Sequence, residues 1–272
     1  MEGERNSTEP RRALSPGGGL GGSVDPVSLR VTVLGSSGSY AAPGNPCTGF
    51  LLSCGGGNLL LDCGPGTRGP LQEQVSLDDL DAVIVTHCHP DHWLELAVLS
   101  VALRYYRPRP PLAVFAGAET WDLGEALLGV GDAAPAFETH VVGAGDSWEV
   151  GSFAVTTSRT AHPVETMAVK VTAAGRSVTF SSDTGPAWDP ASLGSTDLLV
   201  HEATFLDADP RSGSGVHSTA AEAGAAARRA SAPRLVLTHL APGGDVAAFE
   251  AEASGAYGAP VHAAQPGDVL IP

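Results

Sequence analysis

Four potential metal ligands fall within six consecutive residues of this sequence, which reads His87-Cys88-His89-Pro90-Asp91-His92. Imidazole and carboxylate groups are ligands that suit Zn²⁺, and they also bind Mn²⁺ or Fe²⁺. A turn at this point can aim His87 and His89 at one ion, while Asp91 and His92 face a second. The alternative is a chance grouping of surface histidines in a chain that contains nine of them. We interpret the cluster as a centre for two divalent ions.

Three further potential ligands lie far along the chain: His162 in Thr-Ala-His-Pro, Asp183 in Ser-Ser-Asp-Thr-Gly-Pro and His239 in Val-Leu-Thr-His. Taken alone, an aspartate before Thr-Gly-Pro is typical of a turn. A histidine at the end of an apolar run is likewise typical of a hydrogen-bonded strand end. Because a metal-binding cluster precedes them, we expect all three at the same rim as additional ligands.

The elements that position these residues are expected to be short strands and two helices. Residues 81–86 form a nearly continuous apolar run, typical of a buried strand, that leads directly into the histidine cluster. Helical spacing follows over residues 93–106 and, in an alanine-rich segment, over residues 219–231. The other expected strands are 29–35, 50–52, 58–62, 112–115, 153–157, 168–172, 177–181, 197–201 and 234–238. Two β-rich halves flanked by helices predict a sheet sandwich with helices on its outer faces.

The composition of the chain indicates its domain boundaries, its cellular compartment and the kinds of partner that it can bind. The first residues are rich in Gly, Pro, Ser and charge, so we predict a disordered tail over residues 1–28 and one folded domain over residues 29–272. No stretch has the apolar length of a membrane span, and the amino terminus shows no secretion signal, which favours the cytoplasm. Four cysteines without a Cys-x-x-Cys pair are expected to stay reduced. A net charge of −15 with one lysine disfavours an extended nucleic-acid surface.

Several motifs, in order, resemble those of metallo-β-lactamase-fold hydrolases, and among them the ribonuclease Z-like branch. The resemblance covers most of the sequence from Val31 to Ile271. Besides the histidine cluster, the motifs are Leu34-Gly-Ser-Ser-Gly-Ser, Leu60-Leu-Asp-Cys-Gly-Pro-Gly-Thr, Ser182-Asp-Thr-Gly, Leu199-Val-His-Glu-Ala-Thr-Phe, His217-Ser-Thr and Leu237-Thr-His. The resemblance implies an α/β fold, a single-domain αββα sandwich, with two metal ions.

The resemblance also implies a division of the ligands between the two ions. The first ion would take His87, His89 and His162; the second would take Asp91, His92 and His239. Asp183 would bridge them. The main antibiotic-hydrolysing zinc enzymes of this fold use a cysteine at the second metal, so an aspartate makes antibiotic hydrolysis an unexpected function here.

Two such ions, about 3.5–4 Å apart, can activate a shared water and clamp the oxygens of a phosphoryl group. Asp91 is a candidate general base for that water. Asp62 would either orient a ligand imidazole or cap the turn before the next glycine. Glu202 and His217 resemble the family's proton-delivering pair, while Thr219, three residues before a glutamate, also predicts a helix capping box.

Three kinds of substrate remain open. The tRNA-gripping arm of ribonuclease Z is inserted between the positions of His162 and Asp183, where this chain has only twenty residues. Residues 91–96 and 103–108 look more like a subgroup associated with cyclic-nucleotide phosphodiesterase activity. We therefore predict hydrolysis of a small anionic phosphodiester, with RNA 3′-processing or lactone and carboxylic-ester hydrolysis as alternatives. The resemblance also suggests a homodimer.

Several side chains of this region are candidates for holding such a substrate. A guanidinium group can contact phosphate, and an aromatic ring can stack on a base. Taken one by one, the aromatic residues are more typical of packing in the core or at its rim. The candidates are Arg104, Arg107, Arg109, Trp93 and Tyr105.

Overall fold

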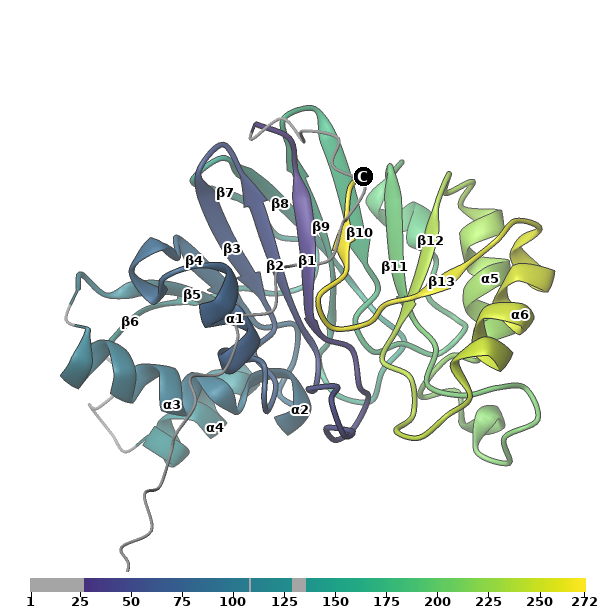
Figure 1. The fold of residues 1–272 in the computed structure, drawn as a ribbon, viewed down its shortest axis with the longest axis horizontal. Helices are drawn as coiled ribbons and strands as arrows, with labels where there is room; N and C mark the ends of the chain where they lie inside the picture. The colour runs from purple at the N-terminus through teal and green to yellow at the C-terminus, as the bar shows by residue number, and fades with distance from the viewer. Residues whose placement is uncertain (1–26, 108, 129–135) are drawn as a thin grey trace, which may run out of the picture.

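The chain folds into two facing β-sheets with helices on their outer sides (Figure 1). The computed structural model describes residues 27–107, 109–128 and 136–272, so the predicted disordered tail lies outside the described residues except for its last two. The predicted α/β sandwich is confirmed, as a single domain that covers most of the chain. Within the described ranges, no helix is long and apolar enough to cross a membrane.

The first sheet begins with the antiparallel meander that the sequence predicts and continues with parallel strands. Its described strands are, in spatial order, β14 (Val269–Leu270), β1 (Arg30–Gly35), β2 (Gly49–Cys54), β3 (Gly57–Leu61), β4 (Ala82–Ile84), β5 (Leu112–Ala116) and β6 (Phe137–Val141). Strand β4 lies inside the sheet and is fully buried, in agreement with its continuous apolar run.

The second sheet has the same number of described strands. They are, in spatial order, β13 (His262–Ala263), β12 (Leu235–Thr238), β11 (Leu198–Glu202), β10 (Arg176–Phe180), β9 (Met167–Ala173), β8 (Phe153–Arg159) and β7 (Ser147–Val150). Strands β10 to β13 are parallel, and β8 runs in the same direction because β9 is antiparallel to both β8 and β10. The carboxyl ends of β8, β10, β11 and β12 therefore lie at one edge of this sheet.

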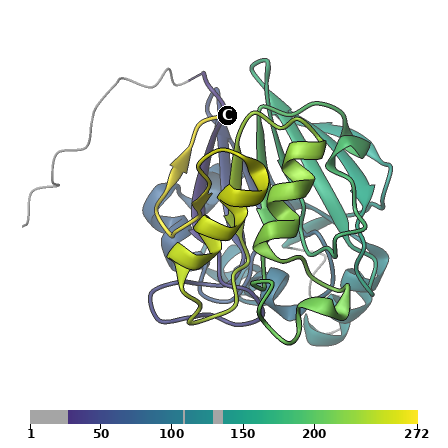
Figure 2. The same ribbon diagram turned by 90° about the vertical axis from the view of Figure 1, so that its right-hand side faces the viewer.

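Helices cover the outer faces of both sheets. On the first sheet lie α1 (Arg68–Gln74), α2 (Pro90–Trp93), α3 (Glu95–Val101) and α4 (Ala118–Leu128); on the second, α5 (Ala220–Arg229) and α6 (Val246–Tyr257) lie side by side (Figure 2). The predicted helix over residues 93–106 is divided into α2, α3 and a π-helical turn, Ala102–Tyr106. Thr219 and Glu222 form the predicted capping box at the start of α5.

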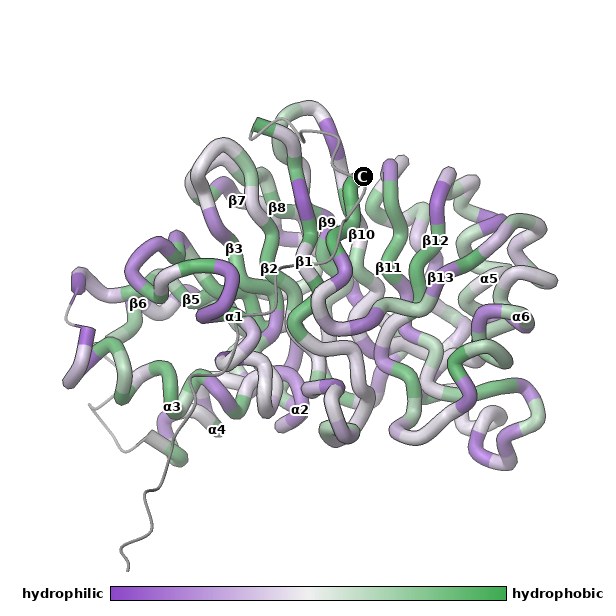
Figure 3. The backbone as a smooth tube through the Cα atoms, in the orientation of Figure 1, coloured by the Kyte–Doolittle hydropathy of each residue, from purple (hydrophilic) through white to green (hydrophobic). Residues whose placement is uncertain are grey.

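Apolar side chains from both sheets fill the space between them. Phe50 on β2 and Phe180 on β10 meet there, with ring centroids 5.0 Å apart. Hydropathy colouring shows apolar strands in the middle of the molecule and more polar segments outside (Figure 3). Buried polar residues at the strand ends are therefore an exception to the pattern of the core, and they require a chemical explanation.

The four cysteines are buried and free, so we expect them to be inert in the folded protein. Burial, with a smaller contribution from Glu95, raises the pKa of the Cys63 thiol to about 12, and burial raises that of Cys54 as well. Thiolate is the reactive form. Ellman's reagent at pH 8 should therefore label none of the four quickly in the native protein and all four in guanidinium chloride. A native thiol that reacts at the rate of a short peptide would contradict the buried arrangement.

Candidate metal centre

The loop after β4 and the helix that follows it carry the histidine cluster. His89 is the N-cap of α2, and Pro90 occupies the first helical turn, where its missing N–H is not needed. This abrupt start to the helix leaves His87 and His89 on the loop and puts Asp91 and His92 on the helix. The sequence-predicted turn between two pairs of ligands is therefore present.

The other three predicted ligands come from the second sheet, at the edge where its strands end. His162 follows β8, Asp183 follows β10 and His239 follows β12. Ser182 and His239 have positive φ angles of 52° and 57°, a conformation that is strained for residues other than glycine. Such strain is typical of functional sites, and here it turns the chain sharply at the end of each strand.

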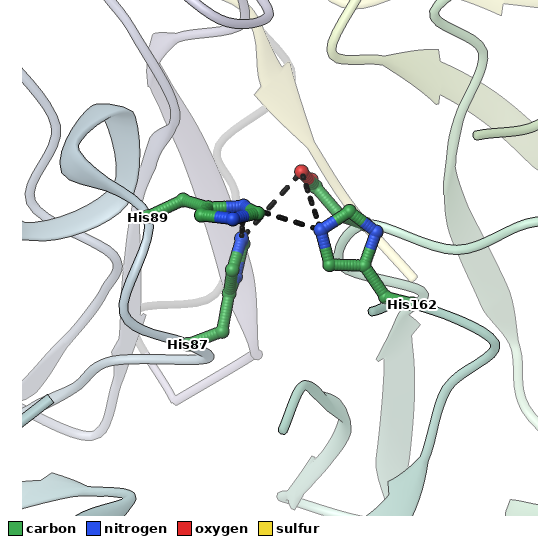
Figure 4. Close-up of side chains that lie close together, drawn as sticks. His87, His89 and His162 are labelled. Carbon is green, nitrogen blue, oxygen red and sulfur yellow. Dashed lines mark hydrogen bonds and ion pairs between the residues drawn. The ribbon is translucent and has the colours of Figure 1, made fainter. Parts of the chain in front are cut away.

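The first group of side chains consists of three histidines and one oxygen of Asp183. His89 Nδ1 lies 3.0 Å from His87 Nε2 and 3.1 Å from His162 Nε2. Asp183 Oδ2 lies 3.5 Å from His87 Nε2 and 3.9 Å from His162 Nε2. The three imidazoles come from opposite halves of the molecule and point toward one another (Figure 4).

The second group uses the other oxygen of the same carboxylate. Asp183 Oδ1 lies 3.2 Å from His92 Nε2 and 3.3 Å from His239 Nε2. Asp91 Oδ2 lies 3.6 Å and 3.2 Å from the same two nitrogens. Ligands about 2.1 Å from a tetrahedral ion are about 3.4 Å from one another. The spacing in both groups therefore fits a cation at the centre of each.

Two buried atoms support this fit independently, because they have no hydrogen-bond partner. They are His92 Nε2 and Asp183 Oδ1, which face each other. The other ring nitrogen of His92 lies 2.7 Å from Asp62 Oδ2 and donates to it, since a carboxylate only accepts. Burial lowers the pKa of His92, but Asp183 and Asp62 outweigh burial and raise it well above its usual value. Once a cation displaces the Nε2 proton, the lone pair of Nε2 is directed at a carboxylate oxygen. A cation between the two atoms satisfies both.

The charge of the site also suits a cation. Burial alone would raise the pKa of Asp183 and lower that of His239, but the attraction between these two groups and their neighbours outweighs burial. As a result, the pKa of Asp183 is well below its usual value, and that of His239 is raised to about 9. His87 behaves differently: burial and the nearby His92 lower its pKa to about 3, which keeps it neutral and able to bind a metal.

Asp62 orients one of these imidazoles, as one of its two sequence interpretations requires. Its carboxylate also accepts hydrogen bonds from the backbone N–H and the hydroxyl of Thr86, at 2.8 and 3.0 Å, so it is fixed on three sides. Its φ of 57° explains why a short polar residue occupies this position.

We expect Asp62→Asn to weaken metal binding about 10- to 100-fold, because the amide no longer holds His92 with a full negative charge. Asparagine keeps the shape of the side chain and tolerates the positive φ. A zinc competition titration with a chromophoric chelator measures the change. Asp122→Asn, on the exposed surface of α4, is the control. Equal affinity in wild type and Asp62→Asn would show that the contact does not act on the metal.

Two glycines of the predicted motifs allow the loops to approach the site closely. A Cβ on Gly38 would lie 2.7 Å from His239 Nδ1, and a Cβ on Gly64 would overlap the backbone carbonyl of Asp91. The residue after Gly38 uses this proximity: the backbone N–H of Ser39 donates to Asp91 Oδ2 at 2.8 Å. The glycine motifs therefore have a steric role in positioning Asp91 and His239.

Glu202 and His217 form the pair that the resemblance suggests. The fully buried Glu202 carboxylate lies 2.8 Å from His217 Nδ1 through Oε1, and it also accepts from the backbone N–H of Thr184 and the hydroxyl of Thr204, both at 2.8 Å. Burial alone would lower the pKa of His217, but Glu202 raises it. The ring lies between His162 and His239, with centroids 5.2 and 5.4 Å away.

Thr204 is a functional candidate that sequence reasoning missed. Its hydroxyl contacts His239 Nδ1 at 2.9 Å and the Glu202 carboxylate at 2.8 Å, and so connects a proposed ligand with the Glu202–His217 pair. The only available signal was its place in the His-Glu-Ala-Thr motif. Residue type and spacing give no indication of this contact, because Thr204 and His239 are 35 positions apart, with α5 and β12 between them.

The predicted phosphate contacts by arginines after α3 are not supported. Arg107 pairs with Asp78, and Arg109 donates to the carbonyls of Leu77, Asp78 and Leu80. These carbonyls precede β4, whereas the histidine cluster follows it. Both arginines therefore lie near the amino end of β4, at the opposite end from the metal ligands. Arg104 stacks on the neighbouring ring of Tyr105, 5.7 Å from its centroid.

The two aromatic candidates for base stacking do not form a common platform either. Trp93 is buried in the core beneath the helices and donates to the carbonyl of Cys88 at 2.8 Å. Tyr105 is exposed on the π-helical turn. Trp93 therefore has the packing role that its residue type favours.

Comparison with known proteins decides the family. The sequence model described as "Beta-lactamase superfamily domain" matches residues 57–240, more than half of the chain and the part that contains every residue of both groups. The chain belongs to the beta-lactamase superfamily. Together with the buried histidine and aspartate groups, this membership makes it a metallo-hydrolase with a site suited to divalent metal ions.

Several known proteins are similar to the chain over most of its length. An uncharacterised protein of Mycobacterium tuberculosis is 32% identical over 247 residues, 87% of this chain and 90% of the relative. A protein called ribonuclease Z from Natronomonas pharaonis is 27% identical over 305 residues, 90% of this chain and 98% of the relative. The crystal structure of YhfI from Bacillus subtilis matches with a TM-score of 0.79 and 26% identity, over 89% of this chain and 98% of that one.

Proposed function

We propose that the chain is a phosphodiesterase that hydrolyses small or cyclic nucleotide phosphodiesters at a centre of two divalent ions, Zn²⁺ in the first instance. The observation that supports this most directly is the position of Asp183, whose two oxygens belong to two separate groups of ligands. In this proposal the first ion is held by His87, His89 and His162, the second by Asp91, His92 and His239, and Asp183 bridges them.

When bound, the two ions would lower the pKa of water and withdraw charge from the phosphoryl oxygens. The chain supplies the remaining functions. Asp91, fixed by the N–H of Ser39 at 2.8 Å, orients the attacking water and accepts its proton. His217 delivers a proton to the leaving-group oxygen from Nε2, because Nδ1 is engaged by Glu202. Glu202 keeps that ring in its orientation and favours its charged form.

A second candidate function is RNA 3′-processing, which the similarity to proteins called ribonuclease Z favours. Between His162 and Asp183, however, the chain forms only β9, a turn and β10. An extended RNA would also meet a surface with a formal charge of −15. These two features favour small substrates over an extended RNA. We propose that the enzyme acts in the cytoplasm.

Assays of the zinc-loaded protein with four substrates test the proposal: bis-p-nitrophenyl phosphate, cyclic AMP, a precursor tRNA and an acyl-lactone. We expect turnover of the first two, with the precursor tRNA cut at least tenfold more slowly per enzyme. Specific cleavage of the precursor tRNA at its 3′ side with no cyclic AMP hydrolysis would favour the ribonuclease function. Turnover of the lactone alone would refute the phosphodiesterase proposal.

A further inference from the structure

We infer that Arg211 and the groove beside it bind a second anionic group on the leaving-group side of the substrate. The inference rests on the proposed phosphodiesterase function and makes its substrate class more specific. The expected substrate is a phosphodiester whose leaving group is of nucleotide size and carries a phosphate of its own, as in a phosphorylated dinucleotide.

One aromatic ring, that of Phe205, connects Arg211 with the proposed proton donor His217. Its guanidinium carbon is 4.8 Å from the centroid of the Phe205 ring, and that ring is perpendicular to His217 at a centroid distance of 6.0 Å. Stacking on an aromatic face holds the guanidinium flat. A leaving group that takes a proton from His217 would therefore have the Arg211 guanidinium nearby, on the other side of the Phe205 ring.

The groove beside Arg211 has the size of a nucleotide. It encloses about 370 Å³, within the usual range for sites that bind small molecules. One wall is the segment from Thr204 to Arg211, and the other is formed by Ala241 to Gly244. Each wall begins beside the proposed ligand His239. Thr204, in the first wall, contacts His239, and Ala241, in the second wall, is two residues after His239 in the chain.

Arg211 is held in place and keeps donors available for a ligand. Its Nε and Nη2 donate to the two carboxylate oxygens of Asp209 at 2.9 and 2.7 Å. This pairing lowers the pKa of Asp209 to about 2, so the pair stays ionised near neutral pH. A guanidinium has five N–H donors, and Asp209 takes two of them, on one edge. The Nη1 edge can bind phosphate.

Arg211 also differs from the other cations of the described chain. It is the one cationic residue among those that line this groove. Lys170 is committed to the carbonyls of Leu193 and Ser195, and Arg107 and Arg109 lie at the far end of β4. The Arg211 side chain is 65% exposed and Asp209 is partly buried, so solvent screens the pair and it contributes little to stability. Arg211 can therefore be substituted without unfolding the protein.

The chemical step is ordinary hydrolysis. Water supplies the hydroxyl that ends on phosphorus, the bond from phosphorus to the leaving oxygen breaks, and the proton from His217 ends on that oxygen. Arg211 takes no part in bond breaking. It binds the phosphate of the departing nucleotide, so its effect should appear mainly in KM.

Three dinucleotides test the inference: thymidylyl-thymidine, and the same molecule with an additional phosphate at its 5′ or its 3′ end. The products of cleavage identify which nucleoside leaves. We expect the wild-type protein to prefer, in kcat/KM, the form whose additional phosphate is on the leaving nucleoside. In Arg211→Met this preference should fall about tenfold, mainly through KM, and Arg211→Lys should retain part of it. Arg176→Met, on the pair with Asp197 away from the groove, is the control and should leave the preference unchanged.

The outcomes separate this inference from the proposed function. Hydrolysis of all three dinucleotides without preference, or with a preference that Arg211→Met retains, would overturn the inference and leave the phosphodiesterase proposal standing. Failure to hydrolyse any dinucleotide or bis-p-nitrophenyl phosphate would refute both. A preference lost equally in Arg176→Met would show a general charge effect and would also overturn the role of Arg211.

Discussion

Replacing Asp183 with alanine is expected to remove metal from both halves of the site and to lower phosphodiesterase activity about a thousandfold or more. Asp183 contributes Oδ2 to the group around His87 and Oδ1 to the group around His92, at 3.5 and 3.2 Å. Without it, each group loses one ligand, and the site loses the carboxylate that lies between the two groups. Plasma mass spectrometry of the purified protein should show fewer than one ion per chain.

A matched control separates this effect from a general loss of charge. Glu149→Gln removes one carboxylate from the exposed strand β7, so both metal content and activity should equal those of the wild type. Asp183→Asn adds a second comparison, since it keeps the side-chain volume while weakening both contacts. If Asp183→Ala retained two ions and full activity, the shared carboxylate would have no role and the two-ion proposal would be wrong.

Replacing His217 with alanine is expected to slow the reaction according to the leaving group. For an alkoxide leaving group, as in a dinucleotide, kcat should fall about 10²- to 10³-fold, because the departing oxygen needs a proton. For p-nitrophenolate, which leaves readily without one, the fall should be less than tenfold. Metal content should not change, because His217 belongs to neither proposed set of ligands.

The ratio of the two effects distinguishes proton delivery from a structural role. His262→Ala, an exposed histidine at the edge of the second sheet, serves as the control and should change neither rate. If His217→Ala slowed both substrates equally, the Glu202–His217 pair would act through the shape of the site. If it released metal as well, His217 would have to be counted as a ligand.

The parts of the site that are local in sequence could be predicted from the sequence. The cluster from His87 to His92 lies on one turn, and an apolar run before it identifies a buried strand. The capping box of α5 is equally local, since Thr219 and Glu222 are three residues apart. Local patterns of this kind follow from side-chain periodicity and capping chemistry, which do not depend on distant contacts.

Contacts between distant segments could not be predicted in the same way. The position of Arg109 depends on carbonyls about thirty residues earlier in the chain, so its charge alone suggested a phosphate contact that the fold does not make. The positive φ of His239 and the stacking of Arg211 on Phe205 likewise arise from tertiary packing. The edge strands β6, β7, β13 and β14 were missed because they are short or partly exposed and have little apolar patterning.

The most direct measurement of the central proposal is anomalous X-ray diffraction at the zinc absorption edge, on crystals grown with zinc. The proposal predicts two peaks, about 3.5–4 Å apart. One should lie within bonding distance of His87, His89 and His162, and the other within bonding distance of Asp91, His92 and His239. Asp183 should bind both. A single peak, or two peaks that Asp183 does not connect, would contradict the proposed dinuclear centre.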